Sequence, residues 1–135
     1  MIALLATVAL VAAPQSGPTA RQMGHASVYA GLCSSLGWVS SQDQIVAQAQ
    51  IYLDGHPEQT DAQVEVLISG GVEAANAEIE GMLAAFRASR DAAALKTSLR
   101  EACNATARDL PSFLARAADT DAQFEVRIAK LLGDL

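Results

Sequence analysis

The stretch TDAQVEVLISGGVEAANAEIEGMLAAF, from Thr60 to Phe86, decides the fold class of this 135-residue chain. Its apolar residues recur at intervals of three and four, which is the period of an α-helix. Charged and polar side chains occupy the opposite face. Thr60 and Gln63 form a capping-box pattern, in which each side chain bonds a free backbone N–H of the first turn. We therefore expect a long amphipathic helix to begin here, with one face formed by Val64, Leu67, Ile68, Val72, Ala75, Ile79, Met82, Leu83 and Phe86.

Two adjacent glycines, Gly70 and Gly71, lie inside this predicted helix. A glycine in a helix interior destabilises the helix by about 1 kcal/mol relative to alanine. A structural reason for this pair is therefore expected. Either another helix packs closely against them, or the helix bends or breaks at this point.

The helical period also appears before this stretch. A first stripe ends at Gly37, after which Trp38 and Val39 are expected to form a buried corner. The segment 41–44 matches a second capping box and opens a helix that Gly55-His56-Pro57 ends, because proline cannot continue the hydrogen-bond ladder.

The period continues after Phe86. Asp91 caps a further segment, and Pro111 forces a kink or a new helix start. Two readings of the C-terminal part stay open. It is one helix from about Asp109 to Leu132, or it breaks at 119–120.

Together these segments predict an all-α fold. Ala, Leu, Val and Ile must fill most of the core, because aromatic residues make up only 4% of the chain. Loops of ordinary length favour an antiparallel bundle of four to five helices. A length of 135 residues corresponds to a single domain, placed at residues 21–135.

The sequence of residues 60–68, TDAQVEVLI, reappears at residues 120–128 as TDAQFEVRI, with seven of nine positions identical. Each copy follows a segment that carries a cysteine. One interpretation is that both copies are capping boxes whose similarity reflects the Ala-rich composition of the chain. The other is an ancient duplication, which would make the fold two related helical halves.

The segment from Met1 to Ala13 has no charged side chain and is too short to span a bilayer, which needs about 20 apolar residues. It matches the apolar region of a secretory signal peptide, so residues 1–20 are predicted to be a leader cleaved after Ala13 or Ala20. The alternatives are a buried N-terminal helix and a translation start at Met23. No stable membrane span is expected.

Two cysteines, Cys33 and Cys103, lie outside the predicted leader. An even number of cysteines suits an oxidising compartment, and a leader would bring the chain to one. We therefore predict a Cys33–Cys103 disulfide and a periplasmic or secreted location. Two buried free thiols are the alternative.

The chain carries 15 acidic and 9 basic residues, a formal net charge of -6. Nucleic-acid binding is not expected, because it depends on clustered Lys and Arg. Several arginines do recur in the second half, and intramolecular pairing with Glu101, Asp109 and Asp119 is favoured over a binding patch for an acidic partner or a lipid headgroup surface. The arginines are Arg87, Arg90, Arg100, Arg108 and Arg116.

Motifs for catalysis and cofactors are missing from the sequence. It has no GxSxG, HExxH, EF-hand, CxxCH or phosphate-loop motif. Its histidines are His25, on the first predicted helix, and His56, in a turn between Asp54 and Glu58. Those two carboxylates with His56 could hold a divalent ion, but we favour a solvated turn. We predict no catalytic, cofactor-binding or metal-binding residue.

The leading hypothesis is therefore a small exported helical protein that is not an enzyme and binds another macromolecule, expected to be a protein. A periplasmic stress chaperone is the first alternative, because 15 carboxylates lose their charge at low pH and a bundle can then open. A ligand carrier or small enzyme is the second, with Tyr29, Trp38 and Tyr52 as candidate pocket aromatics. Whether the chain forms a homo-oligomer stays open.

Overall fold

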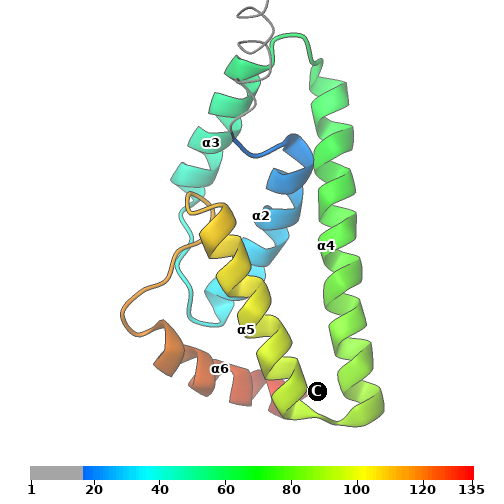
Figure 1. The fold of residues 1–135 in the computed structure, drawn as a ribbon, viewed down its shortest axis with the longest axis vertical. Coiled ribbons are helices and arrows are strands. Elements are labelled where there is room, and N and C mark those ends of the chain that lie inside the picture. The colour runs from blue at the N-terminus through cyan, green and yellow to red at the C-terminus, as the bar shows by residue number, and fades with distance from the viewer. Residues whose placement is uncertain (1–16) are drawn as a thin grey trace, which may run out of the picture.

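The computed structural model describes residues 17–135 and is all-helical over this range, which confirms the predicted fold class. The predicted leader lies almost wholly outside the described residues. An antiparallel bridge between Val39 and Ala115 is the sole β-type pairing in the described part. The helices are α2 (Ala20–Ser35), α3 (Gln42–Gly55), α4 (Asp61–Ser89), α5 (Ala92–Asp109) and α6 (Thr120–Asp134) (Figure 1).

Successive helices from α2 to α5 alternate in direction, and α6 lies across the end of the molecule where α4 passes into α5 (Figure 1). The most extensive helix contact, however, joins α2 and α4, which run in the same direction. The antiparallel neighbours α2 and α3 touch far less. The expected antiparallel bundle thus describes the order of the helices along the chain, whereas the principal packing is between two parallel helices.

Glycines at the crossing of α2 and α4 make this contact possible. A Cβ atom at Gly71 would overlap the backbone oxygen of Arg21 and lie 2.7 Å from the backbone nitrogen of His25. A Cβ atom at Gly24 would overlap the carbonyl oxygen of Ile68. α4 is continuous from Asp61 to Ser89, so close packing of a second helix, and not a break, explains the glycine pair.

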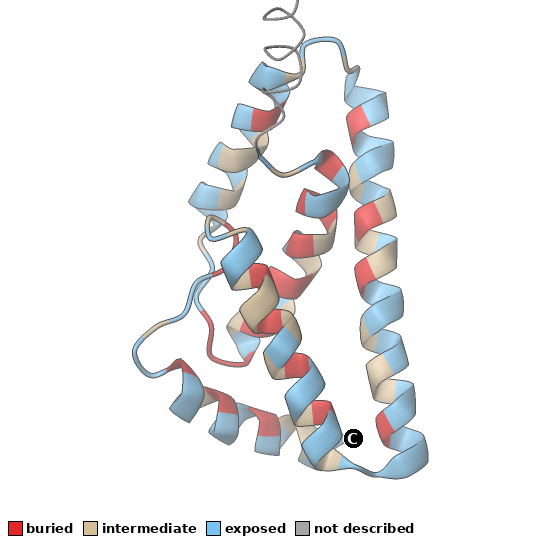
Figure 2. Ribbon diagram, viewed as in Figure 1, coloured by how far each residue is buried: buried red, intermediate tan, exposed pale blue. Residues whose placement is uncertain are grey.

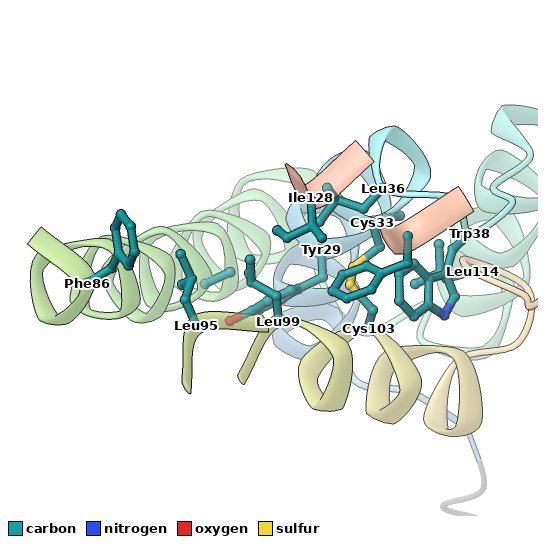
Figure 3. Packing of buried hydrophobic residues seen from close by; sticks show 13 residues of the cluster. Tyr29, Cys33, Leu36, Trp38, Phe86, Leu95, Leu99, Cys103, Leu114 and Ile128 are labelled. Carbon is teal, nitrogen blue, oxygen red and sulfur yellow. A yellow bond between two sulfur atoms is a disulfide. The ribbon is translucent and has the colours of Figure 1, made fainter. Parts of the chain in front are cut away.

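The main core surrounds the disulfide, where α2, α4, α5 and α6 meet (Figures 2 and 3). Trp38 packs edge-on against Phe124, with ring centroids 5.4 Å apart, and its indole N–H donates to Asn104. A second, smaller cluster joins the start of α2 to α3 and to the start of α4. Its buried members are Ala20, Met23, Ala26, Tyr52, Val64 and Phe113.

The connection between α5 and α6 settles the C-terminal alternatives. α5 ends at Asp109 and α6 begins at Thr120, so the single helix to Leu132 is wrong. α6 starts where the other alternative placed a break, but residues 110–119 form no helix before it, and no helix starts at Pro111. Within the connection, Ala115 exchanges two backbone hydrogen bonds of 2.8 Å with Val39. Trp38 is buried as expected, but Val39 is 51% exposed, because this edge pairing uses its backbone and leaves its side chain at the surface.

The two copies of the TDAQ sequence adopt different structures. Thr60 precedes α4 and forms the predicted capping box with Gln63. Thr120 is the first residue of α6 and is fully buried, and the N-cap of α6, Asp119, makes no side-chain capping bond. The Thr120 hydroxyl instead donates to the carbonyl of Gly37 and accepts from the N–H of Ala117. The interpretation of both copies as capping boxes therefore holds at Thr60 and is wrong at Thr120, since tertiary contacts use the Thr120 hydroxyl.

This difference predicts unequal costs for the same substitution at the two copies. Thr120→Val should lower the free energy of unfolding by about 2–3 kcal/mol, because it leaves the buried carbonyl of Gly37 and the partly buried N–H of Ala117 without partners. Thr60→Val removes an exposed cap and should cost about 1 kcal/mol. Urea denaturation of both variants tests this, and equal losses would contradict the buried role of Thr120.

Candidate functional site

The predicted disulfide joins α2 to α5. The Sγ atoms of Cys33 and Cys103 are 2.08 Å apart, the Cα atoms are 5.7 Å apart, and neither residue is exposed to solvent (Figure 3). The alternative of two free thiols is not found. A disulfide of this kind favours an oxidising compartment. Its buried position makes it a structural link between helices and not an accessible redox centre.

A polar cluster that sequence reasoning did not assemble ties α2 to α4. The imidazole Nε2 of His25 lies 2.9 and 3.1 Å from the two carboxylate oxygens of Glu78. The buried Tyr29 donates its hydroxyl to the same carboxylate at 3.0 Å. These residues border a cavity of about 400 Å³ between α2, α4 and α5, whose rim also holds Arg21 and Asp109.

An imidazole bonded to a carboxylate can take part in acid–base catalysis, but only beside a reacting group. Within residues 17–135, His25 forms hydrogen bonds with Glu78 alone, and no nucleophilic side chain bonds to it. Thr106, also at this cavity, donates its hydroxyl to the carbonyl of Ala102 in its own helix. The cluster therefore holds the helices together, and its geometry does not support a particular reaction.

The cluster predicts how Tyr29 responds to alkali. Burial raises the pKa of its phenol well above the usual value, and the hydrogen bond to Glu78 and the charge of that carboxylate raise it further. An unfolded chain ionises tyrosine near pH 10, so the stability that neutral Tyr29 contributes is complete below about pH 10 and is lost as the pH rises further. Tyr29 should therefore stay protonated for as long as the chain is folded. Below the pH of unfolding, wild type and Tyr29→Phe should show the same increase in phenolate absorbance as the pH is raised. A larger rise in wild type would show that Tyr29 ionises in the folded chain.

The predicted turn at His56 is confirmed as a structural element. The ring Nδ1 lies 2.8 Å from the carbonyl oxygen of Tyr52, and the two rings stack with centroids 4.1 Å apart. Asp54 accepts a hydrogen bond from Gln50 of its own helix. Across residues 17–135, no three His, Cys, Asp or Glu side chains form a group that could hold a metal ion.

The arginines of the second half make intramolecular contacts, but of the three expected acidic partners only Asp109 takes part in an ion pair among the described residues. Arg100 pairs with Glu125 of α6 and lies 4.8 Å from the centroid of the Phe124 ring. Glu125 also pairs with Lys96, and the hydrogen bond from that ammonium, with the contribution of Arg100, lowers the pKa of the carboxyl. The remaining contacts are Arg87 with Glu80, Arg90 over Phe86, Arg108 with Asp109, and Arg116 with Asp121.

The most prominent surface feature is an arm formed by α3 and the first half of α4, residues 42–73, which we call the arm. It extends away from the disulfide core, and Tyr52 is the one buried residue of α3 (Figures 1 and 2). Of the eight large apolar residues exposed in the described chain, five lie on the arm. They are Val46 (57% exposed), Ile51 (64%), Leu53 (38%), Val66 (71%) and Leu67 (40%).

Leu67 was expected on the inner face of α4, but it is exposed because α2 packs against Ile68 and Gly71 and leaves the side of α4 that carries Leu67 uncovered. Near the tip of the arm, the turn after α3 and the first turns of α4 form an open groove of about 630 Å³. Its lining combines apolar and polar side chains, namely Glu58, Gln59, Ala62, Gln63, Val66 and Leu67.

The arm is also uniformly acidic. It carries Asp43, Asp54, Glu58, Asp61, Glu65 and Glu73, all exposed, and no Lys or Arg. No ion pair among the described residues involves any of these carboxylates. The sequence analysis missed this feature, although the signal is readable there, because no Lys or Arg occurs between residues 22 and 86.

Comparison of the chain with protein-family models, with curated proteins and with solved structures finds no match. Between residues 17 and 135, none of the helices has both the length and the apolar character needed to cross a membrane. The arm and the disulfide core are therefore the features from which a function can be inferred.

Proposed function

We propose that this chain is an exported, non-enzymatic helical protein that binds a protein partner through the arm. The observation that supports this proposal is the concentration of exposed apolar side chains on residues 42–73. Single exposed apolar residues are normal on protein surfaces, whereas several on one segment, two of which (Val66 and Leu67) line a groove, are typical of an interaction site. The disulfide core supplies a rigid base for the arm, and rigid helical surfaces are common docking sites for protein segments.

Site-specific photocrosslinking in the native cells tests the proposal. A photoreactive residue at Val66, on the arm, is compared with one at Val126, on α6, because the two side chains are 71% and 69% exposed. We expect a discrete adduct from position 66 and none from position 126. The captured protein, once purified, should bind Val66→Asp at least about tenfold more weakly than wild type, a loss of about 1.4 kcal/mol.

The result also separates the proposal from the chaperone alternative, which would use the same apolar surface with little selectivity. A chaperone would yield many adducts from position 66, increasing in number at low pH. Equal crosslinking from positions 66 and 126, or none from either, would refute partner binding through the arm.

Export predicts a particular mature N-terminus. Thr19 caps α2 together with Gln22, and Ala20 is fully buried, so cleavage after Ala20 would remove both from the folded domain. Cleavage after Ala13 leaves them in place. The intact mass of the native protein, alkylated without reduction, should correspond to a chain that begins at Pro14 with no alkylated cysteine. A chain starting at Met23 with two alkylated thiols would refute export.

A further inference from the structure

The charge of the arm, combined with its apolar residues, restricts the chemistry of a partner. The arm carries six of the 15 acidic residues and none of the nine basic ones. Elsewhere in the described chain, acidic side chains do pair with bases, as Glu125 does with Lys96 and Arg100. The guanidinium of Arg21, from α2, lies against Gly70 of the arm, but none of the arm's carboxylates forms an ion pair with a base of the described chain. A partner that approaches the groove therefore meets carboxylates whose charge no ion pair offsets.

The acidic and apolar residues are ordered along α4. Asp61 and Glu65 are four residues apart, so they lie one turn above the other on one side of the helix. Ala62 and Val66 form a second row directly beside the first, and this row lines the groove. Glu58, in the turn before α4, also lines the groove and adds a further carboxylate.

We infer that the arm binds a cationic amphipathic helix of a protein partner. This inference rests on the proposed function. The apolar face of the helix would place a large side chain in the groove against Val66 and Leu67. Lysines or arginines on its flanks would meet Glu58, Asp61 and Glu65. Apolar anchors with complementary charges at the rim are the usual composition of a helix-in-groove interface.

Two other occupants fit the arm less well. Nucleic acids and anionic lipid surfaces are polyanionic, so the arm repels them. A second copy of the arm would bring two sets of six carboxylates together, which opposes self-association through this surface.

Three synthetic peptides test the inference against the folded, disulfide-bonded protein. The first is a labelled Leu/Lys amphipathic helix of about 18 residues, or five turns. The second replaces its lysines with glutamates, and the third replaces its leucines with glutamines. Fluorescence anisotropy should show micromolar binding of the first peptide and at least about tenfold weaker binding of the other two. Added salt should weaken binding of the first peptide.

Matched substitutions show whether the arm is the site. Val66→Ser should weaken binding of the Leu/Lys peptide about tenfold, whereas Val126→Ser, at an equally exposed position on α6, should leave it unchanged. The double variant Glu58→Gln/Glu65→Gln should weaken it and flatten its salt dependence. Glu101→Gln, at an exposed carboxylate of α5, is the charge control.

Several outcomes would overturn the inference. They are equal binding of the Glu-substituted peptide, equal loss of affinity in the arm and control variants, and self-association of the chain through Val66. The crosslinked native partner separates this inference from the proposed function. If that partner binds the arm but the Leu/Lys peptide neither binds nor competes with it, the cationic-helix inference fails and partner binding stands.

Discussion

Gly71→Ala is expected to lower the free energy of unfolding by about 3 kcal/mol, the upper part of the usual range for overpacking. One added methyl group would overlap the backbone oxygen of Arg21 and crowd the backbone nitrogen of His25. These are backbone atoms of a regular helix, so no side chain can rotate away. α2 and α4 must separate, and the cluster of His25, Tyr29 and Glu78 that joins them must shift too. Urea denaturation followed by circular dichroism measures the loss.

Gly81→Ala is the matched control on the same helix. A Cβ atom at Gly81 meets nothing within 4 Å, so the substitution should stabilise the protein by about 0.5–1 kcal/mol through higher helix propensity. The two substitutions are expected to change the free energy of unfolding in opposite directions. Their comparison therefore separates the effect of the α2–α4 contact from the effect of helix propensity. If both variants gain stability, α2 and α4 do not approach each other as closely as the structure shows.

Loss of the disulfide should have the largest effect. The double variant Cys33→Ala/Cys103→Ala is expected to lose about 4 kcal/mol, because the bond closes a long loop and its removal enlarges the unfolded ensemble. For a chain of this size, we expect the melting temperature to fall by about 15 °C. Changing both residues avoids leaving an unpaired thiol in the core.

Reduction of wild type provides an independent comparison. Wild type melted in a strong thiol reductant should approach the melting temperature of the double variant, whereas the variant itself should not respond to reductant. A double variant as stable as oxidised wild type would mean that the bond contributes nothing to folding.

Gly71 and the disulfide both hold α2 in place, and they do so from different helices. Gly71 contacts α2 from α4, and Cys103 contacts it from α5. Domains have only about 5–15 kcal/mol of net stability, so combining the substitutions should leave little or no folded protein. The folding of the arm depends on the disulfide core, because α3 itself buries only Tyr52.

Much of the local structure follows from the sequence alone. The helices and the caps at Ser41, Thr60 and Asp91 are encoded by short patterns whose physics involves neighbouring residues only. From the glycine pair in the long helix, the sequence predicts either close packing of another helix or a bend or break. The two cysteines are compatible with a disulfide but do not require one.

Tertiary structure decided which helices pack together and which side chains they leave exposed. The TDAQ sequence caps α4, but in α6 the same threonine is buried against Gly37, because a hydroxyl bonds whatever group the fold brings near it. Leu67 continues the apolar stripe of α4 yet stays exposed, since α2 covers the neighbouring Ile68 and Gly71 but not the side of α4 that carries Leu67. Periodicity reveals which face of a helix is apolar. Whether that face is buried depends on a partner, which only the fold or another molecule supplies.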